Sequence, residues 1–134
     1  MLDRCQRCVV VVVDDQPIVR EFVEHALQRL GYEVLTAHDA KACLGLMRAC
    51  AGPVHLVISD ILMPGMSGTH LAEVIARERP DTRVLLMTGM TEDEVPKQWA
   101  AKLLFKPFTA DFLQKRVREA LDSAACQGSP PGVT

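Results

Sequence analysis

The sequence has no apolar segment long enough to cross a membrane. Its longest apolar run, Val9 to Val13, is far shorter than the roughly 20 residues that a bilayer span needs. The run ends directly in Asp14-Asp15, whereas the longer apolar core of a secretory signal peptide leads to a small-residue cleavage site. We therefore expect neither a signal peptide nor an association with membranes.

The sequence also lacks an excess of basic residues and an even set of cysteines. It has 15 Lys and Arg against 17 Asp and Glu, and this formal net charge of −2 gives no positive field for a phosphate backbone, so we expect no direct binding of nucleic acid. The 5 cysteines are irregularly spaced, which argues against a disulfide framework and for a reducing cytoplasm. Cys5 and Cys8 form a CxxC, but no second pair follows at metal-ligand spacing, so we expect ordinary thiols.

What is present fits one globular domain. The chain has 134 residues, 49% of them hydrophobic and 24% charged, which is enough for a single core. We expect the domain to cover residues 7–122. Residues 1–6 are then an N-terminal extension, and residues 123–134, which are small, polar or rich in Pro and Gly, form a flexible tail.

Strand-like and helix-like patterns alternate along this domain. Val9 to Val13 is a β-branched run without alternation, which is typical of a strand buried on both faces of a parallel sheet. Further strands are expected at 34–37, 56–59, 84–87 and 103–105. Between and after them, helical spacing predicts inward faces with these residues: Ile18, Phe22, Val23, Ala26, Leu27 and Leu30; Ala40, Cys43, Leu44 and Met47; Leu71, Val74 and Ile75; Phe112, Leu113, Val117 and Leu121.

Helix-capping residues mark where these helices begin and end. Asp39 and Thr109 are expected to cap helices, and Gly31 to end one. Thr91 with Glu94 forms a candidate capping box, but Pro96 limits any helix there to a short or kinked one.

Five strands alternating with five helices predict a doubly wound α/β fold, a three-layer sandwich with a parallel sheet. In the flavodoxin-like class of this fold the strand order is 2-1-3-4-5, and we expect the same order here. In such a fold the ligand site lies at the carboxyl ends of the strands.

Polar residues that a sheet does not require follow four of the five expected strands: Asp14 and Asp15, Asp60, Thr88 and Lys106. Taken singly, adjacent acids such as Asp14-Asp15 are most often a solvated turn, a threonine such as Thr88 a strand-end hydroxyl, and a lysine such as Lys106 a surface residue. Together they should converge on one edge of the sheet. Clustered carboxylates are stable when a hard divalent cation such as Mg²⁺ neutralises them, and an Asp carboxylate there can act as a nucleophile toward phosphorus.

The sequence resembles the response-regulator receiver family over roughly residues 7–122. The resemblance rests on four motifs in order, at the expected strand ends: Asp14-Asp15, the segment Ser59-Asp60-Ile61-Leu62-Met63-Pro64-Gly65-Met66-Ser67-Gly68, Thr88-Gly89, and Phe105-Lys106-Pro107-Phe108.

The resemblance implies a role for each matching position. Asp60 resembles the phosphoacceptor, Asp15 a direct metal ligand and Asp14 a ligand acting mainly through water. Thr88 and Lys106 resemble the hydroxyl and the amine that face the phosphoryl group. The resemblance also implies that the Leu62 backbone carbonyl binds the metal, which would be Mg²⁺ with Mn²⁺ as an alternative ion, and that the Lys106-Pro107 peptide bond is cis.

Two positions depart from the family pattern. Leu103 stands where most receivers carry an aromatic residue that moves between exposed and buried states, so the resemblance does not establish the family's output switch here. The stretch from Thr88 to Lys106 is a few residues shorter than the family norm and contains Pro96 and Trp99. The resemblance therefore does not establish the family's usual dimer contact either.

The leading hypothesis is a cytoplasmic phosphoacceptor that receives a phosphoryl group on Asp60 from a sensor histidine kinase or a phosphotransfer protein. It would act on a downstream protein target, with a weak homodimer as a further partner, and would catalyse only its own phosphorylation and dephosphorylation. The alternatives are an interaction module that works without phosphorylation and a receiver fragment of a hybrid histidine kinase. An aspartate phosphatase of another α/β family would need a DxD motif after the first strand, and Asp14-Asp15-Gln16 lacks it.

Overall fold

The computed structural model describes residues 8–89 and 103–122. The expected extension at 1–6, the expected tail at 123–134 and the short helix expected after Thr91 lie outside these ranges. The elements of the described residues run in the order β1 (Val9–Val13), α2 (Pro17–Gln28), β2 (Glu33–Ala37), α3 (Ala40–Ala49), β3 (Leu56–Asp60), α4 (Gly68–Glu78), β4 (Arg83–Thr88), β5 (Leu103–Phe105) and α5 (Ala110–Asp122).

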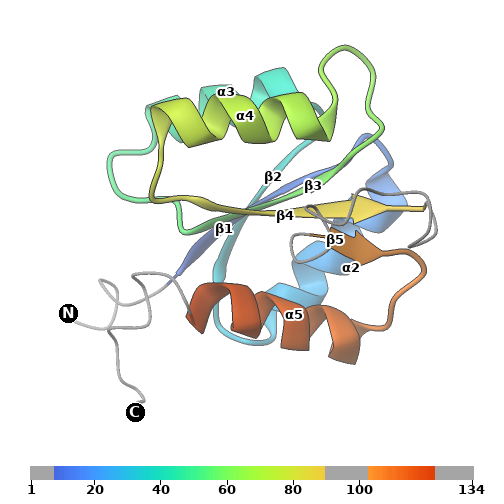
Figure 1. Ribbon diagram of the computed structural model, residues 1–134. Helices are drawn as coiled ribbons and strands as arrows, with labels where there is room; N and C mark the ends of the chain where they lie inside the picture. The colour runs from blue at the N-terminus through green and yellow to red at the C-terminus, as the bar shows by residue number, and fades with distance from the viewer. Residues whose placement is uncertain (1–7, 90–102, 123–134) are drawn as a thin grey trace.

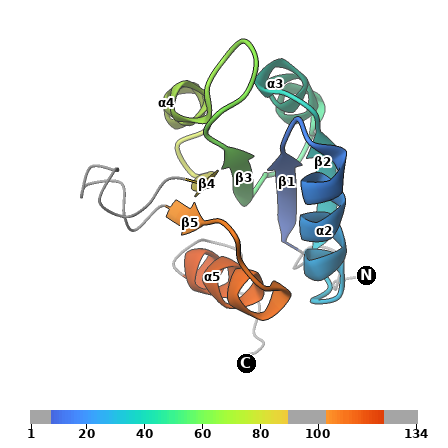
Figure 2. The same cartoon turned by 90° about the vertical axis from the view of Figure 1, so that its right-hand side faces the viewer.

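The five strands form one sheet with the order β2-β1-β3-β4-β5, and every neighbouring pair is parallel. Helices α3 and α4 cover one face of this sheet, and α2 and α5 cover the other (Figure 1). Figure 2 shows the same three layers from the end of the strands. The doubly wound α/β fold and its strand order are therefore confirmed.

Strand β1 shows why an unbroken valine run suits the middle of such a sheet. Val10 and Val12 belong to the core cluster under α2 and α5, while Val11 and Val13 belong to the cluster under α3 and α4. All four side chains have no exposed surface. A strand covered on both faces needs apolar residues at every position, because successive side chains point to opposite faces.

The expected caps are present. The Asp39 carboxylate accepts a hydrogen bond from the Ala42 backbone N–H at 2.8 Å, and the Thr109 hydroxyl accepts one from the Phe112 N–H at 3.1 Å. Helix α2 ends at Gln28, and Gly31 follows with a φ of +90°, a conformation that glycine adopts without the steric penalty of a side chain.

Three residues that the sequence placed in the core are exposed instead. Ile18 is 83% exposed, Phe22 42% and Phe112 46%. All three lie in the first two turns of their helices, α2 and α5. Helical spacing indicates which face of a helix is apolar, but it does not indicate how far the sheet extends beneath that face.

Cys8 also differs from expectation. It is buried and disulfide-bonded, so the prediction of an ordinary thiol is wrong for this residue. Two other cysteines in the described part of the chain, Cys43 and Cys50, are free.

Within residues 8–89 and 103–122, none of the helices combines the length and the apolar character that a membrane crossing requires.

Candidate functional site

The polar strand-end residues meet at the carboxyl edge of the sheet. Asp14 and Asp15 directly follow β1, Asp60 is the last residue of β3, Thr88 is the last residue of β4, and Lys106 directly follows β5. Because all strands run in the same direction, their carboxyl ends lie along one edge. The sheet thus brings together residues that are up to 92 positions apart in the chain, from Asp14 to Lys106.

Three carboxylates and one amine form the centre of this site. Asp14, Asp15 and Asp60 each place one carboxylate oxygen within 4.8 Å of the others. The Lys106 ammonium lies 3.4 Å from Asp60 Oδ2 and 3.6 Å from Asp14 Oδ2. One positive charge therefore faces three acidic groups, and the cluster keeps a net negative charge when all are ionised.

Asp14 is the most enclosed of the three acids. Its side chain has no exposed surface, and Oδ1 accepts a hydrogen bond from the Gln16 backbone N–H at 2.8 Å. Oδ2 is buried and accepts no hydrogen bond, since the Lys106 ammonium at 3.6 Å is close enough for an ion pair but too distant for a hydrogen bond. Burial is the largest cause that raises the pKa of Asp14, partly opposed by the Gln16 N–H and the Lys106 charge.

Asp60 remains accessible from outside. The residue is 8% exposed, its side chain 12%, and the neighbouring Asp15 is exposed. A small part of the Asp60 side chain is therefore open to an incoming group.

These residues fit a hard divalent cation. The carboxylates supply the oxygen ligands that such ions bind, and the buried Oδ2 of Asp14 has a lone pair that no protein group uses. A cation here would offset the mutual repulsion of three neighbouring acids, which Lys106 balances only in part.

The loop after β3 fixes the position of Asp60. The Ile61 N–H donates to the Met87 carbonyl at 3.0 Å, and the Gly68 N–H donates to the Ile61 carbonyl at 2.8 Å. Gly68 lies against the chain just after Asp60: a Cβ at this position would lie 2.9 Å from Ile61 Cα and would collide with the Asp60 carbonyl. Sequence reasoning placed Gly68 only in a loop and missed this contact, because only the tertiary structure brings the start of α4 onto β3.

Thr88 and Lys106 are held by the pairing of β4 with β5. Thr88 is opposite Phe105 in the register, and the Lys106 N–H donates to the Thr88 carbonyl at 2.7 Å. Thr88 is 2% exposed. The Lys106-Pro107 peptide bond is cis, as the resemblance implied. Leu62, whose carbonyl the resemblance implies as a ligand, lies in the loop two residues after Asp60 and is 73% exposed.

An apolar hollow borders the site on the side of Lys106. Its lining residues are Ile18, Val19, Phe22, Lys106, Pro107 and Phe108. The Phe22 and Phe108 rings have their centroids 6.1 Å apart. The sequence did not predict this surface, because it assigned Ile18 and Phe22 to the core.

Comparison with known proteins gives consistent matches. The family model described as "Response regulator receiver domain" matches residues 10–118. The chain is similar to the chemotaxis response regulator CheY4 of Vibrio cholerae, with a TM-score of 0.76 and 30% identity over 86% of this chain and 99% of that one. It is also similar to the response regulator TrrA of Thermotoga maritima in complex with Mg(2+)-BeF, with a TM-score of 0.73 and 33% identity over 85% of this chain and 99% of that one.

A curated relative is much longer than this chain. The chain is 32% identical over 117 residues to "Sensor kinase CckA" of Brucella abortus, which covers 84% of this chain and 12% of that protein. The likeness to the kinase is thus confined to a small part of it.

Proposed function

The chain belongs to the response regulator receiver family, and from this we propose that it is the phosphoacceptor of a two-component phosphorelay, with residues 7–122 as its receiver domain. The observation that carries the proposal is the convergence of Asp14, Asp15 and Asp60 within 4.8 Å of one another, with the Lys106 amine 3.4 Å from Asp60. The resemblance assigns phosphorylation to Asp60, which is both part of this cluster and accessible.

The proposed reaction transfers a phosphoryl group from a phosphohistidine to Asp60. A carboxylate oxygen of Asp60 attacks phosphorus, the new O–P bond forms as the N–P bond of the donor breaks, and the imidazole leaves with a proton. Water later hydrolyses the acyl phosphate and restores Asp60. The chain thus promotes its own phosphorylation and dephosphorylation and transforms no separate metabolite.

Lys106 and Thr88 would stabilise the transferred group. The Lys106 ammonium, which already contacts Asp60 Oδ2, offsets the charge on the phosphoryl oxygens, and the Thr88 hydroxyl donates a hydrogen bond to one of them. Asp15, Asp60, the Leu62 carbonyl and, through water, Asp14 would hold Mg²⁺, with Mn²⁺ as an alternative. When bound, the ion would supply positive charge that offsets the charge of the phosphoryl oxygens.

The proposed partners are a sensor histidine kinase or phosphotransfer protein as donor and a downstream protein as target. The apolar hollow around Ile18 and Phe108 borders Lys106 and offers a contact surface for a protein donor. A donor of this kind places the reaction in the cytoplasm.

The proposal is tested by incubating the chain with acetyl phosphate and Mg²⁺ and measuring the mass of the intact protein. We expect one phosphoryl adduct in the wild type, none in Asp60→Asn, and none when EDTA removes the metal. Asp81→Asn is the matched control, because Asp81 is an exposed acid outside the cluster. It should form the adduct at the wild-type rate.

Other outcomes would favour the other hypotheses. An adduct that persists in Asp60→Asn would contradict the assignment of the phosphoacceptor. No adduct with acetyl phosphate or with any histidine kinase would favour an interaction module that works without phosphorylation. Sustained turnover of added phosphate esters would favour a phosphatase.

A further inference from the structure

The backbone of Asp14 lies where the β1–β2 ladder ends. The Asp14 N–H still donates to the Ala37 carbonyl at 3.2 Å, which continues the parallel pairing by one residue. In a strand the N–H and C=O of one residue point to the same side, so the Asp14 carbonyl also faces β2. However, β2 ends at Ala37, and the chain turns away at Asp39, which caps helix α3.

Arg20 supplies the hydrogen bond that the ladder no longer provides. Its guanidinium Nη1 donates to the Asp14 carbonyl at 2.7 Å. Arg20 lies in the first turns of α2, and its own N–H donates to the Gln16 carbonyl at 3.1 Å. The side chain therefore reaches back six residues and closes the short acidic loop Asp14–Gln16 from the side of β2.

This contact acts on the same loop that carries two of the three carboxylates. Within the loop, Asp14 Oδ1 accepts from the Gln16 N–H at 2.8 Å, so the backbone position of Asp14 determines the direction of its side chain. Lys106 contacts the Asp14 carboxylate, whereas Arg20 contacts the Asp14 backbone. The two cations hold Asp14 at different atoms.

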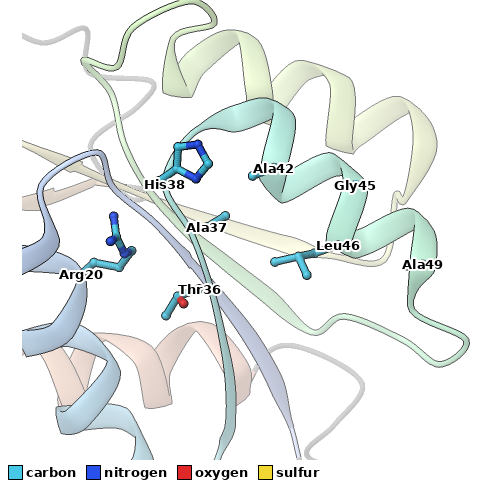
Figure 3. A pocket seen from close by; sticks show the side chains of 8 residues that line it. All are labelled: Arg20, Thr36, Ala37, His38, Ala42, Gly45, Leu46 and Ala49. Carbon is cyan, nitrogen blue, oxygen red and sulfur yellow. The ribbon is translucent and has the colours of Figure 1, made fainter.

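Arg20 also lines a surface pocket. The pocket is further lined by Thr36, Ala37 and His38 at the end of β2, and by residues of one side of α3 (Figure 3). Figure 3 shows the Arg20 side chain beside the end of β2, with His38 above it. Arg20 makes no ion pair with a carboxylate among the residues that the structure describes. In the described part of the chain, the Arg20 guanidinium is thus held by a hydrogen bond to the Asp14 carbonyl and not by an ion pair.

We propose that Arg20 is a positioning residue of the acidic site: by holding the Asp14 carbonyl, it sets the placement of the Asp14 and Asp15 carboxylates and thereby the affinity of the site for a divalent cation. The inference rests on the proposed function only in taking Mg²⁺ as that cation. Arg20 contacts the backbone of Asp14 and forms no ion pair with the carboxylates of Asp14, Asp15 or Asp60.

The test measures Mg²⁺ binding by isothermal titration calorimetry, with no phosphodonor present. Arg20→Met keeps the length of the side chain and removes the donor, and we expect its dissociation constant for Mg²⁺ to rise about five- to tenfold, since a hydrogen bond from a charged donor is lost. Arg20→Lys keeps one donor and the charge and should restore part of the affinity. Arg29→Met, which removes an exposed arginine at the other end of the same helix, should bind as the wild type does.

The melting temperature without metal separates positioning from a general loss of stability. Weaker Mg²⁺ binding in folded Arg20→Met, with rescue by lysine, supports the proposal. An unchanged dissociation constant in Arg20→Met, or an equal weakening in Arg29→Met, overturns it. If Arg20→Met does not fold, Arg20→Lys decides: an affinity at least about twofold weaker supports the role, because lysine cannot reproduce the planar guanidinium, and wild-type affinity overturns it. Absence of Mg²⁺ binding in the wild type would instead overturn the metal site of the proposed function.

Discussion

Gly68 determines how closely helix α4 approaches Asp60. It is the first residue of the helix and is buried, and the space that a Cβ would need is occupied by the backbone of Asp60 and Ile61. Backbone atoms cannot rotate away as a flexible side chain can. Any larger residue at this position must therefore move α4 or the end of β3.

Substituting Gly68→Ala should destabilise the protein by about 1–3 kcal/mol, the usual cost of overpacking, and should slow the phosphorylation of Asp60. Gly45→Ala is the matched control in helix α3, where nothing lies within 4 Å of an added Cβ. It should stabilise the protein by roughly 0.5–1 kcal/mol, because alanine loses less backbone entropy than glycine in a helix. Urea unfolding of both variants checks the opposite signs. Equal effects would show that the close approach at Gly68 relaxes without cost.

At the scale of elements, a histidine links the starts of strands β1 and β3. The His55 Nδ1 accepts a hydrogen bond from the Val9 N–H at 2.9 Å, and the His55 N–H donates to the Val9 carbonyl at 2.9 Å. Burial lowers the pKa of His55. The folded state thus prefers the neutral imidazole, because only an unprotonated Nδ1 can accept this bond.

The direction of the pH effect follows from that shift. Since the pKa is lower in the folded than in the unfolded state, the stabilisation is complete above the unfolded pKa of about 6.5 and is lost as the pH falls through the folded-state value. His55→Asn keeps an acceptor near the Nδ1 position and does not titrate. We expect wild type to lose more stability than His55→Asn between about pH 7.5 and 5.5, as measured by urea unfolding. Parallel losses in the two proteins would contradict a role of His55 in the pH dependence.

At the scale of the whole molecule, the buried charge of the acidic site lowers the stability of the folded state, which the apolar core provides. Two apolar clusters, one on each face of the sheet, enclose β1 and β3. Asp14 directly follows β1 and is buried as well. Because the folded-state pKa of Asp14 is raised, its charge costs stability at neutral pH. This cost decreases as the pH falls below the folded-state pKa and is absent below the unfolded pKa of about 3.9. The fold thus tolerates an unfavourable charge at the position where a cation would bind.

Removing this charge should stabilise the metal-free protein. We expect Asp14→Asn to melt at a higher temperature than wild type in EDTA, since the amide keeps Oδ1 as the acceptor for Gln16 and carries no charge. Mg²⁺ at about 100 times its dissociation constant should stabilise wild type by about 2.7 kcal/mol and Asp14→Asn much less. Asp81→Asn should respond to Mg²⁺ as wild type does. An Asp14→Asn protein that melts below wild type in EDTA would show that the ionised group stabilises the fold.

Much of the architecture could be predicted because each element carries its own local signal. The valine run of β1 is apolar at every position, and the structure buries it on both faces of the sheet. The Asp39 and Thr109 caps were also predicted correctly, because a cap is a contact between residues only three apart. The strand order was adopted from the fold class, and the structure confirms it.

From the sequence by itself, the strands are predicted to be buried and parallel, and polar residues follow them. Because parallel strands share one carboxyl edge, this pattern determines that Asp14, Asp60 and Lys106 meet there. The tertiary structure decided how far neighbouring elements extend, and therefore that Ile18 is exposed, that α4 requires Gly68, and that Arg20 reaches the Asp14 carbonyl. The physical reason is that periodicity and capping act within a few residues of the chain. The end of a strand, the approach of a helix and the loss of a ladder partner are relations between segments that only the folded chain brings together.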